Sequence, residues 1–192
     1  MTLWLARHAL PLVESGVCYG ALDVAADGPA TQAAAKKLAA AVPLGCAVAS
    51  SPLQRCELLT LTLCALRPDL TPQFDPRLRE MDFGGWEGQH WDAIGQSAVE
   101  AWTADFAGYR PGGGESVRGF MQRVAAAWDA VGTQPTLWIT HAGVARACSL
   151  LATGIRSLDR ADQWPQAAPG FGEWLTFEPA IPAQMPPDRP RC

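Results

Sequence analysis

Thr136-Leu137-Trp138-Ile139-Thr140-His141-Ala142-Gly143-Val144 is the stretch that decides the fold. It contains an apolar run, then a single histidine, and then the start of a second apolar segment. Residues 136–140 are rich in side chains that suit a buried strand. Residues 144–151, which follow the His-Ala-Gly turn, predict a helix. A strand that leads directly into a helix is typical of α/β proteins with a parallel sheet.

The same alternation continues toward both ends of the chain. Three further apolar runs predict strands, at residues 2–6, 46–49 and 173–177. Three segments with helical signals predict helices, at residues 29–42, 52–66 and 115–131. The sequence therefore predicts an α/β three-layer sandwich with a mostly parallel central sheet, formed by a single domain over residues 1–178.

Two parts of the chain lack this alternation. Residues 67–114 are richer in Pro, Gly and Trp and predict loops with short helices. Within them, Gly112-Gly113-Gly114 lacks the spacing of a phosphate-binding glycine motif and predicts a flexible loop before a helix. Residues 179–192 are proline-rich and predict a poorly ordered tail.

Composition narrows the classes of function. Hydrophobic residues make up 48% of the chain and charged residues 18%, which excludes a disordered polyampholyte. The formal net charge of −4 offers no basic footprint for nucleic acid or a membrane surface, so we expect a small-molecule partner. The six cysteines form no CxxC pair and no metal-ligand spacing, and no secretory signal pattern opens the chain. We therefore expect a reduced, cytoplasmic protein with no bound metal, and the oligomeric state stays open.

Two of the three histidines directly follow predicted strands. Arg7 and His8 come after the first strand, residues 50–55 with Arg55 after the second, and His141 after the third. Ligands of open α/β sheets bind at the carboxyl ends of the strands. Arginines there can hold phosphate oxygens through charge-assisted hydrogen bonds, and a neutral imidazole can attack phosphorus. This edge is predicted to bind a phosphate dianion, with one histidine as nucleophile and the other stabilising charge.

An alkoxide leaving group needs a proton, and residues 78–88 contain carboxyl groups that can supply it. The candidates for this general acid are Glu80, Asp82 and Glu87. Their residue types and spacing do not choose among the three.

Five motifs follow one another along the chain: Arg7-His8, residues 50–55, residues 80–88, Gly113-Gly114-Glu115-Ser116 and Thr140-His141-Ala142-Gly143. With these motifs in this order, residues 3–155 resemble the histidine phosphatase (phosphoglycerate mutase-like) superfamily. The resemblance implies that His8 is the phosphorylated nucleophile and that Arg7, Arg55 and His141 form the phosphate pocket, with His141 also acting in catalysis. It further implies that Glu80 donates the proton, that Glu87 belongs to a structural turn and that no cofactor is needed.

One part of the chain resembles a narrower group. Residues 7–11, Arg-His-Ala-Leu-Pro, and residues 16–24, Gly-Val-Cys-Tyr-Gly-Ala-Leu-Asp-Val, are similar to the opening of α-ribazole-5′-phosphate phosphatases of cobalamin assembly. Those enzymes release phosphate from α-ribazole 5′-phosphate or from its corrinoid-linked form. The resemblance implies this activity for the chain, with Tyr19 and Gly20 in contact with the substrate.

Ala9, Pro11 and Glu14 stand where the mutase pattern has glycine, serine and asparagine, which favours phosphatase over mutase chemistry. Three other functions stay open: a phosphatase of another small phosphometabolite such as a sugar or glycerate phosphate, a phosphoglycerate mutase-type phosphotransferase, and a non-catalytic phosphate-binding protein. Whether Glu14 or Glu115 lines the site is also open.

Some of these side chains have a structural alternative. Arg55 can cap a helix or pair with Glu57, and Tyr19 can serve packing alone. Trp91 and Trp102 are core residues by default, but they lie in the loop-rich middle and can form the floor under an aromatic substrate.

Overall fold

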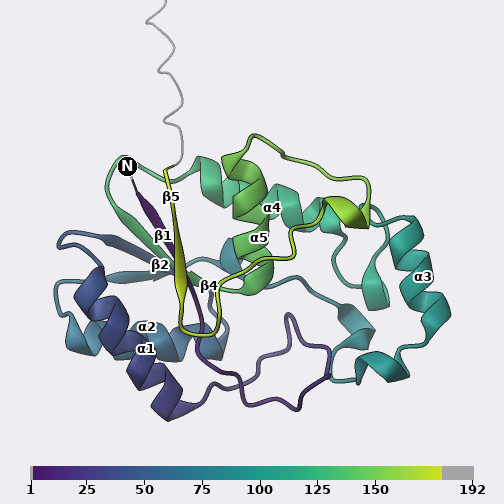
Figure 1. The fold of residues 1–192 in the computed structure, drawn as a ribbon. Helices are drawn as coiled ribbons and strands as arrows, with labels where there is room; N and C mark the ends of the chain where they lie inside the picture. The colour runs from purple at the N-terminus through teal and green to yellow at the C-terminus, as the bar shows by residue number, and fades with distance from the viewer. Residues whose placement is uncertain (1, 179–192) are drawn as a thin grey trace, which may run out of the picture.

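One five-stranded sheet runs through the centre of the protein, with the strand order β3-β2-β4-β1-β5 (Figure 1). The computed structural model describes residues 2–178. The strands are β1 (Leu3–Arg7), β2 (Ala47–Ser50), β3 (Pro72–Phe74), β4 (Thr136–Thr140) and β5 (Trp174–Phe177). Strands β1 to β4 pair in parallel, whereas β5 pairs antiparallel with β1. The predicted α/β fold with a mostly parallel sheet is confirmed.

Helices cover both faces of this sheet and give the three predicted layers (Figure 1). The outer layers are formed by α1 (Gly28–Ala41), α2 (Gln54–Leu66), α4 (Val117–Asp129) and α5 (Ala142–Ala152). Leu137 and Ile139 of β4 pack into the core under α1 and α2, and Trp138 packs into the core under α4 and α5. Because successive side chains of a strand point to opposite faces, a strand that serves two cores is a continuous apolar run.

The starts of the helices explain why the chain turns where it does. Asp27 caps α1 by accepting a hydrogen bond from the N–H of Ala30 at 2.7 Å, and Ser116 caps α4 through the N–H of Gly119 at 3.2 Å. Helix α5 begins two residues earlier than predicted, directly after His141, whose side chain makes no cap hydrogen bond. The imidazole is therefore available to the sheet edge.

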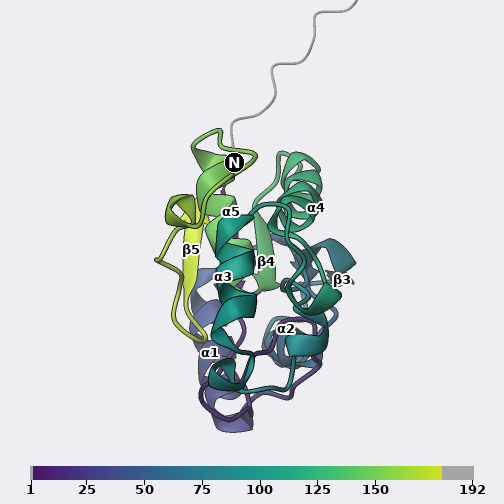
Figure 2. The same cartoon turned by 90° about the vertical axis from the view of Figure 1, so that its right-hand side faces the viewer.

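The segment between α2 and α4 contains the short helices that the sequence predicts, and also a strand that it does not. β3 is a three-residue edge strand with Pro72 at its first position, and it has no apolar alternation. The nine-residue helix α3 (Gln96–Ala104) has no buried residue. It stands at the edge of the molecule, and Figure 2 shows it in front of the sheet. Trp102 is the residue of α3 that packs against the core, where it contacts Phe106.

The glycine run before α4 forms a turn, as its predicted loop position requires. Gly84 and Gly112 both have positive φ, at 53° and 57°, and a Cβ on Gly84 would lie 2.4 Å from the Gly112 carbonyl oxygen. The glycines thus let this turn pack closely against the segment that follows the predicted general acid.

Residues 179–192, the predicted tail, lie outside the described residues. Five cysteines within residues 2–178 are free thiols, and four of them are buried. No helix of the described segment combines the length and apolarity that crossing a membrane requires.

Candidate active site

His8 follows β1, and a hydrogen bond to the backbone orients its ring. The residue is 2% exposed, and its Nδ1 lies 2.7 Å from the carbonyl oxygen of Ala9. Because a carbonyl oxygen only accepts hydrogen bonds, Nδ1 carries the ring proton and Nε2 keeps its lone pair. Burial, followed by the positive charges of Arg55 and Arg7, lowers the pKa of His8 to about 3. The neutral ring has its free nitrogen held in one orientation, as a nucleophile requires.

His141 lies opposite His8, with the two ring centroids 5.2 Å apart. It is fully buried at the junction of β4 and α5, and its Nε2 lies 2.9 Å from Oγ of Ser51 and 3.5 Å from Sγ of Cys56. Burial, and then the charge of Arg55, lowers the pKa of His141 well below its usual range. The ring is neutral near pH 7 and can donate its single N–H to a phosphate oxygen.

Arg55 is fully buried in the first turn of α2. Its Nη1 donates to the carbonyl oxygen of Leu22 at 2.9 Å and its Nη2 to that of Gly20 at 2.6 Å. None of the ion pairs within residues 2–178 includes Arg55, so it does not pair with Glu57. A buried cation that is bonded to neutral carbonyl groups is incompletely compensated and favours an anion beside it.

Arg7 ends β1 next to the nucleophile candidate. Its Nη1 donates to the carbonyl oxygen of Pro169 at 3.1 Å, and its guanidinium carbon lies 3.8 Å from the ring centroid of Phe171. Burial of the guanidinium lowers the pKa of Arg7 and outweighs the opposite effects of Tyr19 and Glu80. The fold thus brings both predicted phosphate arginines and both histidines to one edge of the sheet.

The three carboxyl groups that the sequence left as alternatives have different surroundings. Glu80 lies beside the first turn of α5, where its Oε2 accepts a hydrogen bond from the N–H of Gly143 at 3.0 Å. A Cβ on Gly143 would lie 2.2 Å from Oε1 of Glu80, so this approach requires glycine. Glu87 instead accepts a hydrogen bond from the N–H of Ala21 at 2.9 Å and holds a loop, and Asp82 is exposed. Of the three carboxyl groups, Glu80 is the one that lines the cavity at the site.

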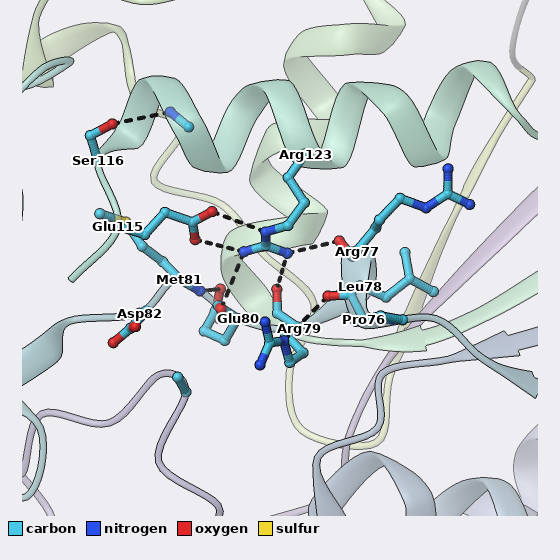
Figure 3. Close-up of polar contacts among 12 residues, drawn as sticks. Pro76, Arg77, Leu78, Arg79, Glu80, Met81, Asp82, Glu115, Ser116 and Arg123 are labelled. Atoms are coloured by element: carbon cyan, nitrogen blue, oxygen red, sulfur yellow. Dashed lines mark hydrogen bonds and ion pairs between the residues drawn. The ribbon is translucent and has the colours of Figure 1, made fainter.

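Arg123 of α4 holds the backbone around Glu80 (Figure 3). Its Nε and Nη2 bind the carboxylate of Glu115 at 3.0 and 2.7 Å. Its Nη1 donates to the carbonyl oxygens of Arg77 and Arg79 at 2.8 and 2.9 Å, and its Nη2 reaches the carbonyl of Glu80 at 3.4 Å. The backbone of Glu80 is thus fixed by α4 and its carboxylate by α5. Glu115 serves this ion pair and does not line the cavity.

His8 and Glu80 open into one cavity of about 250 Å³, whereas the fully buried His141 and Arg55 lie behind its wall. Its polar wall consists of Arg7, His8, Tyr19, Glu80 and Arg146. Much of the remaining wall is aromatic, formed by Phe83, Trp91, Trp102, Phe106, Phe120 and Trp164. An apolar wall with a few convergent polar groups is typical of a small-molecule site. Within residues 2–178, no group of three or more His, Cys, Asp or Glu side chains is arranged to hold a metal ion.

Tyr19 lines this cavity, whereas Gly20 is absent from its wall. A Cβ on Gly20 would lie 1.9 Å from the carbonyl oxygen of Met81, so the glycine lets two loops pass closely. The carbonyl of Gly20 accepts the short hydrogen bond from Arg55, which links the glycine to this predicted phosphate ligand. Glu14 is exposed and is not part of the wall.

The residues of the site that were not predicted are Ser51, Arg123, Arg146 and Phe171, together with the wall residues Phe83, Phe106, Phe120 and Trp164. Ser51 lies inside the motif after β2, and Arg146 lies one helical turn after the glycine of the last motif. Placement within a motif and helical spacing were therefore usable signals for these two. Phe171 reaches Arg7 from the loop before β5, and no local pattern indicates that contact.

Comparisons with known proteins agree with this geometry. The sequence profile of the histidine phosphatase superfamily (branch 1) matches residues 3–171, whereas no curated protein matches the chain. Among solved structures, TTHB049 from Thermus thermophilus is 29% identical over 92% of this chain and 92% of its own, with a TM-score of 0.71. A mycobacterial glucosyl-3-phosphoglycerate phosphatase is 27% identical over 91% of this chain and 88% of its own, with a TM-score of 0.71. A protein described as mycobacterial hydrolase 2 is 26% identical over 94% of this chain and 84% of its own, with a TM-score of 0.71.

Proposed function

The chain belongs to the histidine phosphatase superfamily, and from this premise we propose that it is a phosphomonoesterase that forms a phosphohistidine on Nε2 of His8. The observation that carries the proposal is the hydrogen bond from Nδ1 of His8 to the carbonyl of Ala9, which leaves Nε2 free. The nearby guanidinium groups of Arg7 and Arg55 supply the positive charge that a phosphate dianion needs.

In the first step, Nε2 of His8 attacks phosphorus and the bond between phosphorus and the ester oxygen breaks. Glu80, as the carboxylic acid, gives its proton to the leaving oxygen, so the alcohol departs neutral. The two arginines and the N–H of His141 stabilise the charge on the phosphoryl oxygens as the bonds change.

In the second step, water attacks phosphorus of the phosphohistidine. The carboxylate of Glu80 takes a proton from this water, and the nitrogen–phosphorus bond breaks. His8 returns to the neutral form that its lowered pKa favours. The sum of both steps is one ester and one water converted to one alcohol and one phosphate.

We propose α-ribazole 5′-phosphate, or its corrinoid-linked form, as the substrate, and thus a role in cobalamin nucleotide-loop assembly. The similarity of residues 7–24 to the opening of such enzymes supports this substrate. Tyr19 belongs to that stretch and lines the cavity, and the walls of Trp91 and Trp102 suit a planar benzimidazole ring. The free cysteines among residues 2–178 support a reducing, cytoplasmic compartment.

A carboxylated sugar phosphate is the second candidate for the substrate. One structural neighbour is a glucosyl-3-phosphoglycerate phosphatase, and a guanidinium such as that of Arg146 in the cavity wall suits a carboxylate.

The test is trapping of an acid-labile phosphoenzyme together with steady-state phosphate release, with EDTA present. We expect both from the wild type and from His90→Ala, the control at an exposed histidine. In His8→Ala the phosphoenzyme should be absent and turnover should fall by at least about 10³-fold. Equal turnover by the wild type and His8→Ala would contradict the proposal. Phosphate binding without turnover would identify a binding protein, and phosphate moving within the substrate would identify a mutase.

The substrate is tested with α-ribazole 5′-phosphate beside sugar, glycerate and nucleotide monophosphates. Preference for α-ribazole 5′-phosphate by at least about 10²-fold in kcat/KM, roughly 2.7 kcal/mol, supports the cobalamin role. Similar kcat/KM values for all these substrates, lost in His8→Ala, would support the phosphatase function and contradict this substrate.

A further inference from the structure

Arg146 lies on α5 and lines the same cavity as His8 and Glu80. It comes three residues after Gly143, so it stands about 4.5 Å farther along the helix axis than the glycine that binds Glu80. Since Glu80, the proposed proton donor to the leaving oxygen, lines the same cavity, a leaving group that enters this cavity comes within the space that Arg146 lines.

Arg146 is one of six among the eleven arginines of residues 2–178 that have no carboxylate partner there. Five arginines lie within 2.9 Å of a carboxylate, namely Arg67, Arg77, Arg123, Arg156 and Arg160. Arg146 has no carboxylate partner within residues 2–178, and its Nε is buried without a hydrogen-bond partner there. Its charge also contributes to the lowered pKa of Arg7, on the same wall. Placing the two cations Arg7 and Arg146 in a largely aromatic wall without a carboxylate beside them does not favour folding. Features that oppose folding in this way are typical of functional sites.

The structural alternative is that Arg146 ties α5 to the loop before β5. Its Nη2 donates to the carbonyl oxygen of Gln166, but the distance is 3.3 Å and the contact is exposed. One long hydrogen bond uses a single donor of the five on a guanidinium, and its net contribution to stability is small. The remaining terminal donors have no acceptor among residues 2–178.

We propose that Arg146 determines substrate specificity by donating hydrogen bonds to oxygen acceptors of the leaving group, beyond the phosphate ester. The proposal rests on the phosphatase function proposed above. A guanidinium fork fits the two oxygens of a carboxylate, and it can also bridge two vicinal hydroxyl oxygens. The substrate class is then a phosphomonoester whose leaving group carries one of these oxygen pairs. Loss of Arg146 should weaken binding of such substrates and raise KM more than it lowers kcat.

The experiment compares wild type, Arg146→Met and Arg146→Lys on three substrates. α-Ribazole 5′-phosphate offers vicinal hydroxyls, 3-phosphoglycerate offers a carboxylate, and phenyl phosphate offers no oxygen beyond the ester. In Arg146→Met, kcat/KM of an oxygen-bearing substrate relative to phenyl phosphate should fall about 10- to 100-fold. Arg146→Lys should recover only part of the lost kcat/KM ratio, because lysine keeps the positive charge but lacks the two-pronged guanidinium. Arg156→Met, which removes an exposed arginine paired with Asp129, is the matched control and should keep the wild-type ratio.

The same substrates are also titrated by calorimetry in the His8→Ala background, where binding is not followed by turnover. If Arg146→Met lowers the affinity for 3-phosphoglycerate alone, the carboxylate is the group that Arg146 binds. If it lowers the affinity for α-ribazole 5′-phosphate alone, the vicinal hydroxyls are that group. Ratios of Kd and kcat/KM that stay within threefold of wild type in folded Arg146→Met overturn the inference. Wild type that binds the substrates but releases no phosphate contradicts the proposed function instead, and the Kd ratios still decide the role of Arg146.

Discussion

The proposed phosphate pocket, with Arg7, His8, Arg55 and His141, and the cavity wall beside it are built by different parts of the fold. His8, Arg55 and His141 are 2%, 0% and 0% exposed, and they follow strands at one edge of the sheet. Much of the cavity wall comes from the segment between α2 and α4, where Trp91 is 36% exposed and α3 has no buried residue. The difference teaches that the sheet positions the groups proposed to bind phosphate, while segments outside the sheet form most of the wall proposed for the leaving group.

A change inside the phosphate pocket should affect every substrate, and Arg55→Lys tests this most strongly. Lysine keeps the charge but loses the fork that holds the Gly20 and Leu22 carbonyls at 2.6 and 2.9 Å. We expect kcat/KM to fall about 10²- to 10³-fold for phenyl phosphate and for other monoesters alike. Steady-state kinetics measure this effect, with Arg118→Lys on the exposed face of α4 as the control. A loss confined to one substrate would contradict the division between pocket and wall.

Glu80 lies where the two regions meet, so the effect of replacing it should depend on the leaving group. Glu80→Gln should slow phenyl phosphate about 10²-fold and p-nitrophenyl phosphate less than about tenfold, because nitrophenolate needs little protonation. Gly143→Ala should act in the same direction, because its new Cβ displaces the carboxylate of Glu80. The measurement is kcat/KM for both esters, because this ratio reports phosphoryl transfer to His8 and not the later hydrolysis that both esters share. Asp82→Asn at an exposed carboxyl is the control. Equal losses on the two esters would remove Glu80 from the role of general acid.

The burial of the pocket also predicts how stability depends on pH. The pKa of His8 is lowered to about 3 and that of His141 is lowered too, while an unfolded histidine keeps a pKa near 6.5. Between these values the unfolded state binds more protons than the folded state. The free energy of unfolding should be greatest above about pH 6.5 and fall below it, by up to about 1.4 kcal/mol per pH unit for each buried histidine. Urea unfolding between pH 7.5 and 5 measures this slope.

His8→Asn should flatten this slope, and His90→Asn, at an exposed histidine, should leave it unchanged. A slope that is the same in wild type and His8→Asn would show that the buried ring does not oppose protonation.

A change in the outer wall should have the smallest and most selective effect. Trp91→Leu should raise KM for α-ribazole 5′-phosphate about three- to tenfold, which corresponds to the loss of an aromatic contact. KM for ribose 5-phosphate, which has no aromatic ring, should rise less. Phe74→Leu at the exposed edge strand β3 is the matched control. Equal increases for both substrates would argue against an aromatic leaving group.

The grouping of Arg7, His8, Arg55 and His141 at one edge of the sheet was accessible to sequence reasoning because these residues adjoin strong local patterns. Arg7, His8 and His141 directly follow apolar runs, and one topological rule brings the carboxyl ends of parallel strands together. The general acid was not accessible in this way. Glu80, Asp82 and Glu87 have the same local signal, and they differ only in what packs against each of them.

The sequence by itself determined the α/β layers, the strands buried on both faces and the place of both histidines. These features depend on periodicity and adjacency among near neighbours in the chain. Only the tertiary structure decided the tautomer of His8, the choice of Glu80, the aromatic wall and the position of Arg146, which has no carboxylate partner among residues 2–178. Each of these depends on the packing of segments that lie far apart in the sequence. Burial and proximity of that kind arise only when the chain has folded, and no local pattern encodes them.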